Sequence, residues 1–382
     1  MTVQDQRLAE VQTPALLLDE AKMTRNIDRL AAHVGGKGVM LRPHLKTAKS
    51  TDVARRVLTD GTGPATVSTL AEAEVFAEMG VRDIIYAVGI TPDKLGRVAA
   101  LRDKGCDLSV LLDSVAQAQA VAEASARLGQ AIPALIELDC DGHRSGVAPG
   151  DPVLVEIGRI LHEGAAELRG VLTHAGESYE MTGRDVHRAL AEVERAAAVG
   201  AAETLRAAGL PCPVVSIGST PTAHAIEDLT GVTEVRAGVY VFFDLVQAGI
   251  GACQQDDIAL SVLTTVIGHQ QQKGWVITDA GWMAMSRDRG TAAHAVDQGY
   301  GVVCDEAGQP IPGLTVIKAN QEHGIIAARE GYEGEVSDLP LGTRLRILPN
   351  HACATAAQYG AYHVIPSAPG APLLTWPRFG GW

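Results

Sequence analysis

Short apolar runs alternate with alanine-rich stretches along the first two thirds of the chain. The alanine-rich stretches have apolar residues at helical spacing, as in Leu70–Met79, Ser114–Leu128 and Val186–Ala208. This alternation is typical of a parallel sheet, and eight strands in succession predict a (β/α)8 TIM barrel. A doubly wound sheet is the alternative, but no G-x-G-x-x-G motif follows the first strand. The expected strands are Val39–Leu41, Ala65–Val67, Asp83–Val88, Leu108–Leu112, Ala134–Leu138, Leu168–Leu172, Val214–Ile217 and Val232–Arg236.

The pattern changes after about Asp244. Long helical stretches end there, and strand-like runs separated by turns follow one another. These runs favour a smaller, mostly β domain. We therefore predict a barrel over residues 13–245 and a β domain over residues 246–382. The expected strands of the β domain are Leu260–Gly268, Gly274–Asp279, Leu314–Ala319, Gly324–Ala328 and Thr343–Leu348.

Charge and composition exclude several classes of protein. The net charge of −13 argues against a general nucleic-acid binder, and an anionic substrate would need a local basic pocket. Residues 1–10 are polar and no run of 18 apolar residues occurs, so we expect no signal peptide and no membrane partner. The six cysteines form no C-x-x-C motif, which excludes a zinc ribbon and a disulfide framework. Together these features predict a cytoplasmic protein.

Lys46 lies in the segment Leu41–Ser50, between an expected strand and an expected helix. In an α/β barrel, catalytic side chains collect at that edge of the sheet. A lysine there can form a Schiff base with an aldehyde when burial or neighbouring charge lowers its pKa. An exposed lysine in a basic turn is the alternative.

Polar segments follow later strands at the same edge. They are Asp139–Gly146, Thr173–Tyr179 and Ser216–Thr222. The third has small hydroxyl residues before a helix, which suits a phosphate because backbone N–H groups stabilise the anion. Glu234–Tyr240 comes one strand later, and barrels favour phosphate sites after strands seven and eight. Each segment alone is also compatible with an ordinary turn.

His351 and Cys353 form a close His/Cys pair. Two residues apart on an extended segment, their side chains point the same way and can bind one metal. Sulfur with imidazole favours zinc, while manganese or cobalt can substitute. A buried cysteine beside a chance histidine is the alternative.

Two motifs carry a resemblance to a known family. Thr-Pro-Ala-x-x-x-Asp at Thr13–Asp19 precedes Arg-Pro-His-x-Lys-Thr-x-Lys at Arg42–Lys49 by about 30 residues. The chain resembles the alanine racemase-like (fold type III) pyridoxal phosphate enzymes, in the branch of the D-serine dehydratases and D-threonine aldolases. The resemblance spans roughly Thr13 to Trp382. Around Asp141–Gly146 and Asn350–Thr355 it is especially close to D-threo-3-hydroxyaspartate dehydratases.

The resemblance also implies roles for individual residues. Lys46 would carry pyridoxal 5'-phosphate, and His323 in Glu-His-Gly would face the active site as a second catalytic residue. His351 and Cys353 would hold the metal. Residues 1–20 would join the β domain, and the chain would form a homodimer. The cofactor-binding residues would be Lys46, His44, Arg144, His174, Tyr179, Gly218, Ser219, Thr220, Gly238 and Tyr240.

These parts together predict a lyase acting on D-3-hydroxy amino acids. Pyridoxal phosphate stabilises a carbanion at Cα, and a divalent metal makes the β-hydroxyl a better leaving group. Elimination of water from D-threo-3-hydroxyaspartate or D-serine type substrates then gives a 2-keto acid and ammonia. The main alternative is a D-threonine aldolase, which cleaves the substrate to glycine and an aldehyde. An amino acid racemase and a non-catalytic pyridoxal phosphate carrier explain the metal pair less well.

Overall fold

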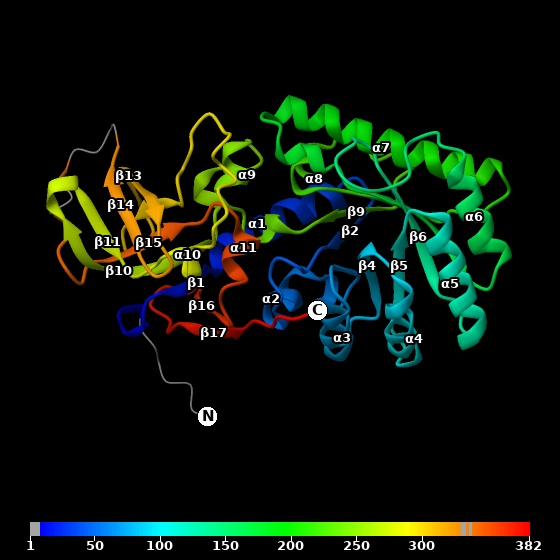
Figure 1. The fold of residues 1–382 in the computed structure, drawn as a ribbon, viewed down its shortest axis with the longest axis horizontal. Coiled ribbons are helices and arrows are strands. Elements are labelled where there is room, and N and C mark those ends of the chain that lie inside the picture. Colours follow the sequence, from blue (N-terminus) through cyan, green and yellow to red (C-terminus); the bar gives the residue numbers. More distant parts are fainter. Residues whose placement is uncertain (1–7, 330–333, 336–337) are drawn as a thin grey trace. The chain divides into compact units, whose positions relative to one another are not determined.

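The computed structural model describes residues 8–329, 334–335 and 338–382 (Figure 1). The chain divides into two compact units, and each is described by itself. The barrel unit comprises Asp28–Gly238 with Gly381–Trp382, and the β unit comprises Met1–Ile27 with Val239–Gly380. The division at residue 245, expected from the change of pattern, stays a prediction.

The barrel unit contains a sheet of eight described strands, ordered β2-β9-β8-β7-β6-β5-β4-β3, in which neighbouring strands pair in parallel. The two end strands approach each other, because His44 bridges Thr66 and the Leu45 N–H donates to the Thr66 carbonyl at 2.9 Å. The sheet is therefore a nearly closed barrel, which confirms the predicted fold class. The strands are β2 (Met40–Pro43), β3 (Ala65–Val67), β4 (Asp83–Gly89), β5 (Asp107–Leu112), β6 (Pro133–Leu138), β7 (Glu167–Thr173), β8 (Val214–Ile217) and β9 (Glu234–Ala237).

Helices connect these strands and cover the outside of the sheet (Figure 1). Local signals set their ends: Thr69 and Ser114 accept N-terminal backbone N–H groups of α3 and α5, and left-handed Gly80 and Gly129 end those helices. The helices are α1 (Glu20–Gly35), α2 (Thr51–Val57), α3 (Leu70–Met79), α4 (Leu95–Asp103), α5 (Val115–Leu128), α6 (Val153–Glu163), α7 (Arg184–Ala207) and α8 (Thr220–Ala225).

The β unit is built on a sheet of nine described strands, ordered β11-β14-β13-β12-β15-β10-β1-β16-β17. The N-terminal strand β1 pairs with β10 and β16. Three strands were not expected: β12 is only three residues long, and β16 and β17 follow a helix near the C-terminus. The strands are β1 (Ala15–Asp19), β10 (Leu260–Gln270), β11 (Trp275–Thr278), β12 (Val302–Cys304), β13 (Pro310–Ala319), β14 (Gly324–Ala328), β15 (Arg344–Leu348), β16 (Ala361–Ile365) and β17 (Leu374–Pro377).

Short helices complete the β unit. They are α9 (Leu245–Gly249), α10 (Trp282–Met285) and α11 (Ala352–Ala356). Within the described part of the chain, no helix is long and apolar enough to cross a membrane.

Candidate active site

Lys46 lies in the turn between β2 and α2, with an exposed side chain. Its backbone N–H donates to His44 Nδ1 at 3.4 Å. Its charge is among the causes that lower the pKa of both His44 and His174, after burial, so its ammonium lies near both rings. Among the described residues, no carboxylate forms an ion pair with Lys46. The lysine is therefore available for chemistry.

Lys49, three residues later, is held in place. Its ammonium lies 3.1 Å from the buried Glu72 carboxylate of α3 and 5.7 Å from the centre of the Trp382 ring. The other Glu72 oxygen accepts the Ser68 N–H at 2.9 Å. Lys49 thus has a structural partner, which distinguishes it from Lys46.

The two histidines near Lys46 are neutral. Burial lowers the pKa of His174 to about 3, and the charges of Lys46, Arg236 and Arg144 act in the same direction. His174 Nδ1 donates to the Gly218 carbonyl at 2.9 Å, so its Nε2 carries the free lone pair. Burial also lowers the pKa of His44 well below its usual value. His44 Nδ1 accepts from Lys46, which leaves Nε2 to donate to Ser68 Oγ at 3.3 Å.

The loop after β8 is shaped by tight packing. Gly218 has φ +139°, and a Cβ there would overlap the Arg236 carbonyl oxygen of β9. Glycine is thus required for strand packing, whatever the loop binds. The Ser219 side chain caps α8 by accepting the Thr222 N–H. In contrast, the buried Thr220 Oγ1 has no hydrogen-bond partner in the described structure.

Tyr179 and Gly238 adjoin this loop. The Tyr179 hydroxyl accepts the Thr220 N–H at 3.3 Å, and its ring centre lies 6.0 Å from that of His174. At Gly238, just past β9, a Cβ would lie 3.1 Å from both the Cβ and the carbonyl oxygen of His44. The ends of β2, β7, β8 and β9 are therefore packed against one another at the side chains that the sequence singled out.

Arg144 reaches the site from the loop after β6. Its Nη2 lies 3.2 Å from Glu137 Oε1, and Ser145 Oγ donates to the other Glu137 oxygen at 3.3 Å. The guanidinium is more than half exposed, whereas Glu137 is buried on β6. The buried Glu137 carboxylate thus holds the guanidinium of the exposed Arg144 side chain at the edge of the barrel.

Tyr240 belongs by contact to the β unit. It lies in the 3-10 helix Val239–Val241 and is fully buried, and burial raises the pKa of its hydroxyl. Its predicted contact with the cofactor phosphate stays a prediction.

Sequence reasoning missed the residue that ties two of these loops together. Glu194, buried on α7, accepts the Ala175 N–H at 3.0 Å and the Gly218 N–H at 2.9 Å. It also accepts the Thr222 hydroxyl at 2.8 Å. Burial raises its pKa against the effect of these hydrogen bonds. The available signal was an acidic residue on the helix face that otherwise carries Ala191, Ala198 and Leu205.

A second missed feature is a buried polar chain that crosses four strands. Arg42 donates to Glu234 at 2.8 Å, Ser216 donates to Glu234 at 2.6 Å, and Arg236 donates to Ser216 at 2.8 Å. Arg236 also donates to the Thr173 carbonyl at 2.7 Å. Each buried charge therefore has partners, as burial in a barrel interior requires.

In the β unit, His351 and Cys353 come together, although not on an extended segment as predicted. His351 is the extended N-cap of α11, and Cys353 lies in the first turn of that helix. Burial alone would lower the pKa of His351, but hydrogen bonds to Asp288 and Cys353 raise it to about 11. The two side chains are thus in contact as a nitrogen–sulfur donor pair. Among the residues described, no group of three or more His, Cys, Asp or Glu forms a metal site.

His323 lies in the turn between β13 and β14 and is exposed. The turn is closed by a hydrogen bond from the Asn320 N–H to the His323 carbonyl at 2.8 Å. Its role in catalysis stays a prediction.

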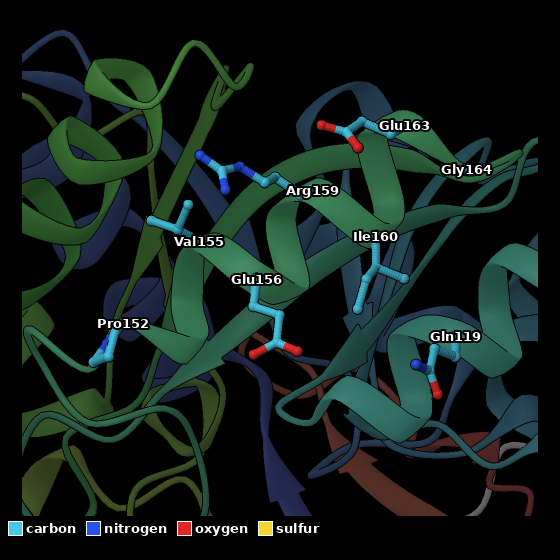
Figure 2. Close-up of a pocket in the computed structure, with 8 residues that line it drawn as sticks. All are labelled: Gln119, Pro152, Val155, Glu156, Arg159, Ile160, Glu163 and Gly164. Atoms are coloured by element: carbon cyan, nitrogen blue, oxygen red, sulfur yellow. The ribbon is translucent and has the colours of Figure 1, made fainter.

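Figure 2 shows a surface hollow that contains none of these residues. It is lined by α6, its flanking residues Pro152 and Gly164, and Gln119 of α5. The side chains of Glu156, Arg159 and Glu163 point in different directions, so they do not converge on one ligand (Figure 2). We therefore place the candidate active site at the strand ends and not at this hollow.

The chain is similar to known proteins over both of its units. Residues 18–246 match the family "Alanine racemase, N-terminal domain", and residues 259–365 match "Putative serine dehydratase domain". The D-threo-3-hydroxyaspartate dehydratase of Delftia sp. (strain HT23) is 56% identical over 98% of this chain and 99% of its own length. The structure of that enzyme has a TM-score of 0.96 to this one, covering 99% of this chain and all of the other.

Two further solved structures extend the comparison. One is a D-threo-3-hydroxyaspartate dehydratase with a cysteine replaced by alanine, in the metal-free form. It is 55% identical, with a TM-score of 0.96, and the match covers 99% of this chain and 100% of the other. The other is the D-threonine aldolase of Filomicrobium marinum, 26% identical with a TM-score of 0.81, covering 97% of this chain and 96% of the aldolase. The predicted resemblance to the branch of D-serine dehydratases and D-threonine aldolases is confirmed. The chain belongs to the alanine racemase N-terminal domain family, and its second part carries the serine dehydratase domain.

Proposed function

We propose that the protein is a lyase that uses pyridoxal 5'-phosphate and a divalent metal to eliminate water from D-3-hydroxy amino acids. Its substrates are of the D-threo-3-hydroxyaspartate or D-serine type, and the products are a 2-keto acid and ammonia. The likeness to the Delftia dehydratase, which extends over both units, supports this activity. The observation that carries the proposal is the contact between His351 and Cys353, because a racemase has no use for such a donor pair.

The barrel residues fit the cofactor. Pyridoxal phosphate, when bound, supplies an electron sink for the carbanion at Cα. Lys46 is the attachment point, since its neighbour Lys49 is engaged with Glu72. The Thr220 hydroxyl, buried and without a partner in the described structure, suits a phosphate oxygen. His174 offers a neutral ring next to Lys46, and Arg144 lies on the same edge.

Lys46 would also serve as the base. When it is not attached to the cofactor, its amine would take up the α-proton of the substrate. Neutral His44 and His174 add no positive charge that would compete for the substrate carboxylate or hold the proton. The hydrogen bond from His174 to the Gly218 carbonyl fixes the orientation of the imidazole ring next to Lys46.

The His351–Cys353 pair fits zinc, with manganese or cobalt as substitutes. Thiolate sulfur and imidazole nitrogen are the donors that zinc prefers, and two protein ligands leave positions open for substrate oxygens. The His351 side chain is 42% exposed, so a substrate can approach it. The cysteine-to-alanine variant of a D-threo-3-hydroxyaspartate dehydratase, in the metal-free form, supports a metal at a cysteine in that relative.

Retro-aldol cleavage is the second candidate. It uses the same parts with a base acting on the β-hydroxyl, and the likeness to the Filomicrobium aldolase favours it over racemisation or cofactor carriage. We further propose that the chain works as a cytoplasmic homodimer, in line with its family resemblance.

The test is a panel of D-3-hydroxy amino acids, each scored for ammonia, keto acid, aldehyde and change of configuration. We expect ammonia and keto acid in equal amounts, with 3-hydroxy-D-aspartate and D-serine as substrates. Glycine and aldehyde as main products would replace dehydration by retro-aldol cleavage. Racemisation without either product set would overturn the lyase proposal.

A further inference from the structure

Asp288 is held firmly in the loop that follows α10. Its Oδ1 accepts the Gly290 N–H at 2.8 Å, and its backbone N–H donates to Ser286 Oγ at 3.2 Å. Its carbonyl accepts Asn350 Nδ2 at 3.1 Å, and Asn350 directly precedes His351 in the chain. The loop is thus joined to the segment that carries the metal pair.

A second bond joins the same two segments. Thr355 Oγ1 of α11 donates to the Met285 carbonyl at the end of α10, at 2.8 Å. Ser286, the next residue, has φ +75°, an unusual value for a residue other than glycine. The chain direction at Arg287 and Asp288 is therefore set by the packing of α10 on α11.

The second carboxylate oxygen of Asp288, Oδ2, faces His351. Asp288 Oδ2 lies 2.7 Å from His351 Nδ1, 63 residues away in sequence. A carboxylate can only accept here, so Nδ1 carries a proton and stays engaged with Asp288, and Nε2 is the nitrogen whose proton a metal ion can displace. Because Nδ1 is engaged, Nε2 is the nitrogen available to a metal shared with Cys353.

We infer that Asp288 is a positioning residue for the metal: it fixes the His351 ring and its tautomer so that Nε2 is aimed at the ion. This inference rests on the proposed function. Carboxylates that hold a ligating histidine in this way commonly contribute about 10–100-fold to metal affinity. Asp288 would act through the ring, because its two carboxylate oxygens already accept from Gly290 and His351.

Zinc affinity of the holoenzyme, measured by competition with a chromophoric chelator, tests the inference. Asp288→Asn should bind zinc about 10–100-fold more weakly. The matched control is Asp297→Asn, because Asp297 lies in the same loop but pairs with Arg289 at 2.7 Å. That control should bind zinc like the natural chain. Equal affinity in Asp288→Asn would overturn the inference, whereas absence of zinc binding by the natural chain would instead contradict the proposed metal.

Cobalt(II) in place of zinc supplies a readout that a purely structural role would not move. The visible spectrum of cobalt should shift in Asp288→Asn, because the orientation and basicity of His351 change, and stay unchanged in Asp297→Asn. Asp288→Glu, which keeps the acceptor, should recover part of the affinity. If Asp288→Asn fails to fold, Asp288→Ser, which also lacks the carboxylate, takes its place, and unchanged zinc affinity with an unchanged cobalt spectrum in that variant would overturn the inference.

Discussion

The two candidate sites are assembled in different ways. In the barrel unit, each functional side chain follows a different strand, so the parallel sheet itself gathers Lys46, Arg144, His174 and Thr220 at one edge. In the β unit, both proposed metal ligands come from one short segment, and the residues that hold them in place come from far away in sequence. Asp288 holds the His351 ring, and Asp244 accepts the Ala352 N–H at 2.9 Å. The order of the parallel strands brings the residues of the barrel site together. In the β unit, hydrogen bonds from distant loops orient the residues of the second site.

The largest expected effect separates Lys46 from Lys49. Lys46→Arg should lose the covalent attachment of the cofactor and, with the base gone, at least ~10²–10⁴-fold in ammonia release. Lys49→Arg should keep its pairing with Glu72 and lose far less. Borohydride reduction followed by peptide mapping identifies the attached lysine in each protein. Loss of the label in Lys49→Arg, with the label kept in Lys46→Arg, would reverse the assignment.

The next effect concerns the carboxylate behind the barrel site. In the natural chain, three groups donate hydrogen bonds to the Glu194 carboxylate. Glu194→Gln keeps the shape of the side chain but replaces one carboxylate oxygen by an NH2 group, which cannot accept a hydrogen bond. We expect about 1–3 kcal/mol less stability and weaker binding of pyridoxal phosphate, since one buried donor loses its acceptor. Denaturant unfolding and a cofactor titration measure both. Glu203→Gln, on the exposed face of the same helix, is the control and should change stability by less than ~0.5 kcal/mol.

A smaller effect comes from the loop after β8. Thr220→Val removes a hydroxyl that has no partner in the described structure, so stability should stay near its natural value. If this hydroxyl binds phosphate, the Kd for pyridoxal phosphate should rise about tenfold, as expected for a hydrogen bond to a charged group. Thr222→Val is the contrasting variant. It breaks the cap of α8 and a bond to Glu194, and so should cost stability.

An unchanged Kd in a folded Thr220→Val protein would remove the hydroxyl from the site. Gly218→Val cannot serve this purpose, because its side chain would collide with β9 whether or not the loop binds phosphate.

The smallest expected effect is a dependence of stability on pH, caused by His174, in the protein without cofactor. The pKa of His174 is lowered from 6.5 to about 3, so the folded state disfavours its protonation. Its neutral ring therefore contributes stability above pH 6.5, and that contribution is lost as the pH falls toward 3. Long-range ¹H–¹⁵N spectra of the histidine rings should show His174 as the neutral Nδ1–H tautomer between about pH 5 and 8. A titration midpoint within that range would contradict the burial argument.

The comparison of the two sites also explains what could be predicted from the sequence. Strand–helix alternation predicts the barrel. Because catalytic side chains collect where barrel strands end, the segments after β2, β6, β7, β8 and β9 could then be chosen from the sequence alone. The His351–Cys353 pair could be found from its spacing, but not its helical conformation, because the cap of α11 depends on Asp244. The roles of Glu194 and Asp288 could not be predicted, since hydrogen-bond partners of these residues lie 24 and 63 residues away in sequence.

We propose that the barrel residues hold the cofactor and that the metal of the β unit is needed only for elimination. Removal of metal from the holoenzyme tests this most directly. The barrel residues should keep the cofactor bound, so its visible absorbance should persist after chelation. Ammonia release should be lost, because nothing then polarises the β-hydroxyl, and added zinc should restore it. The Cys353→Ala protein should behave like the chelated enzyme and respond poorly to zinc. Full ammonia release from metal-free protein that still holds its cofactor would contradict the account.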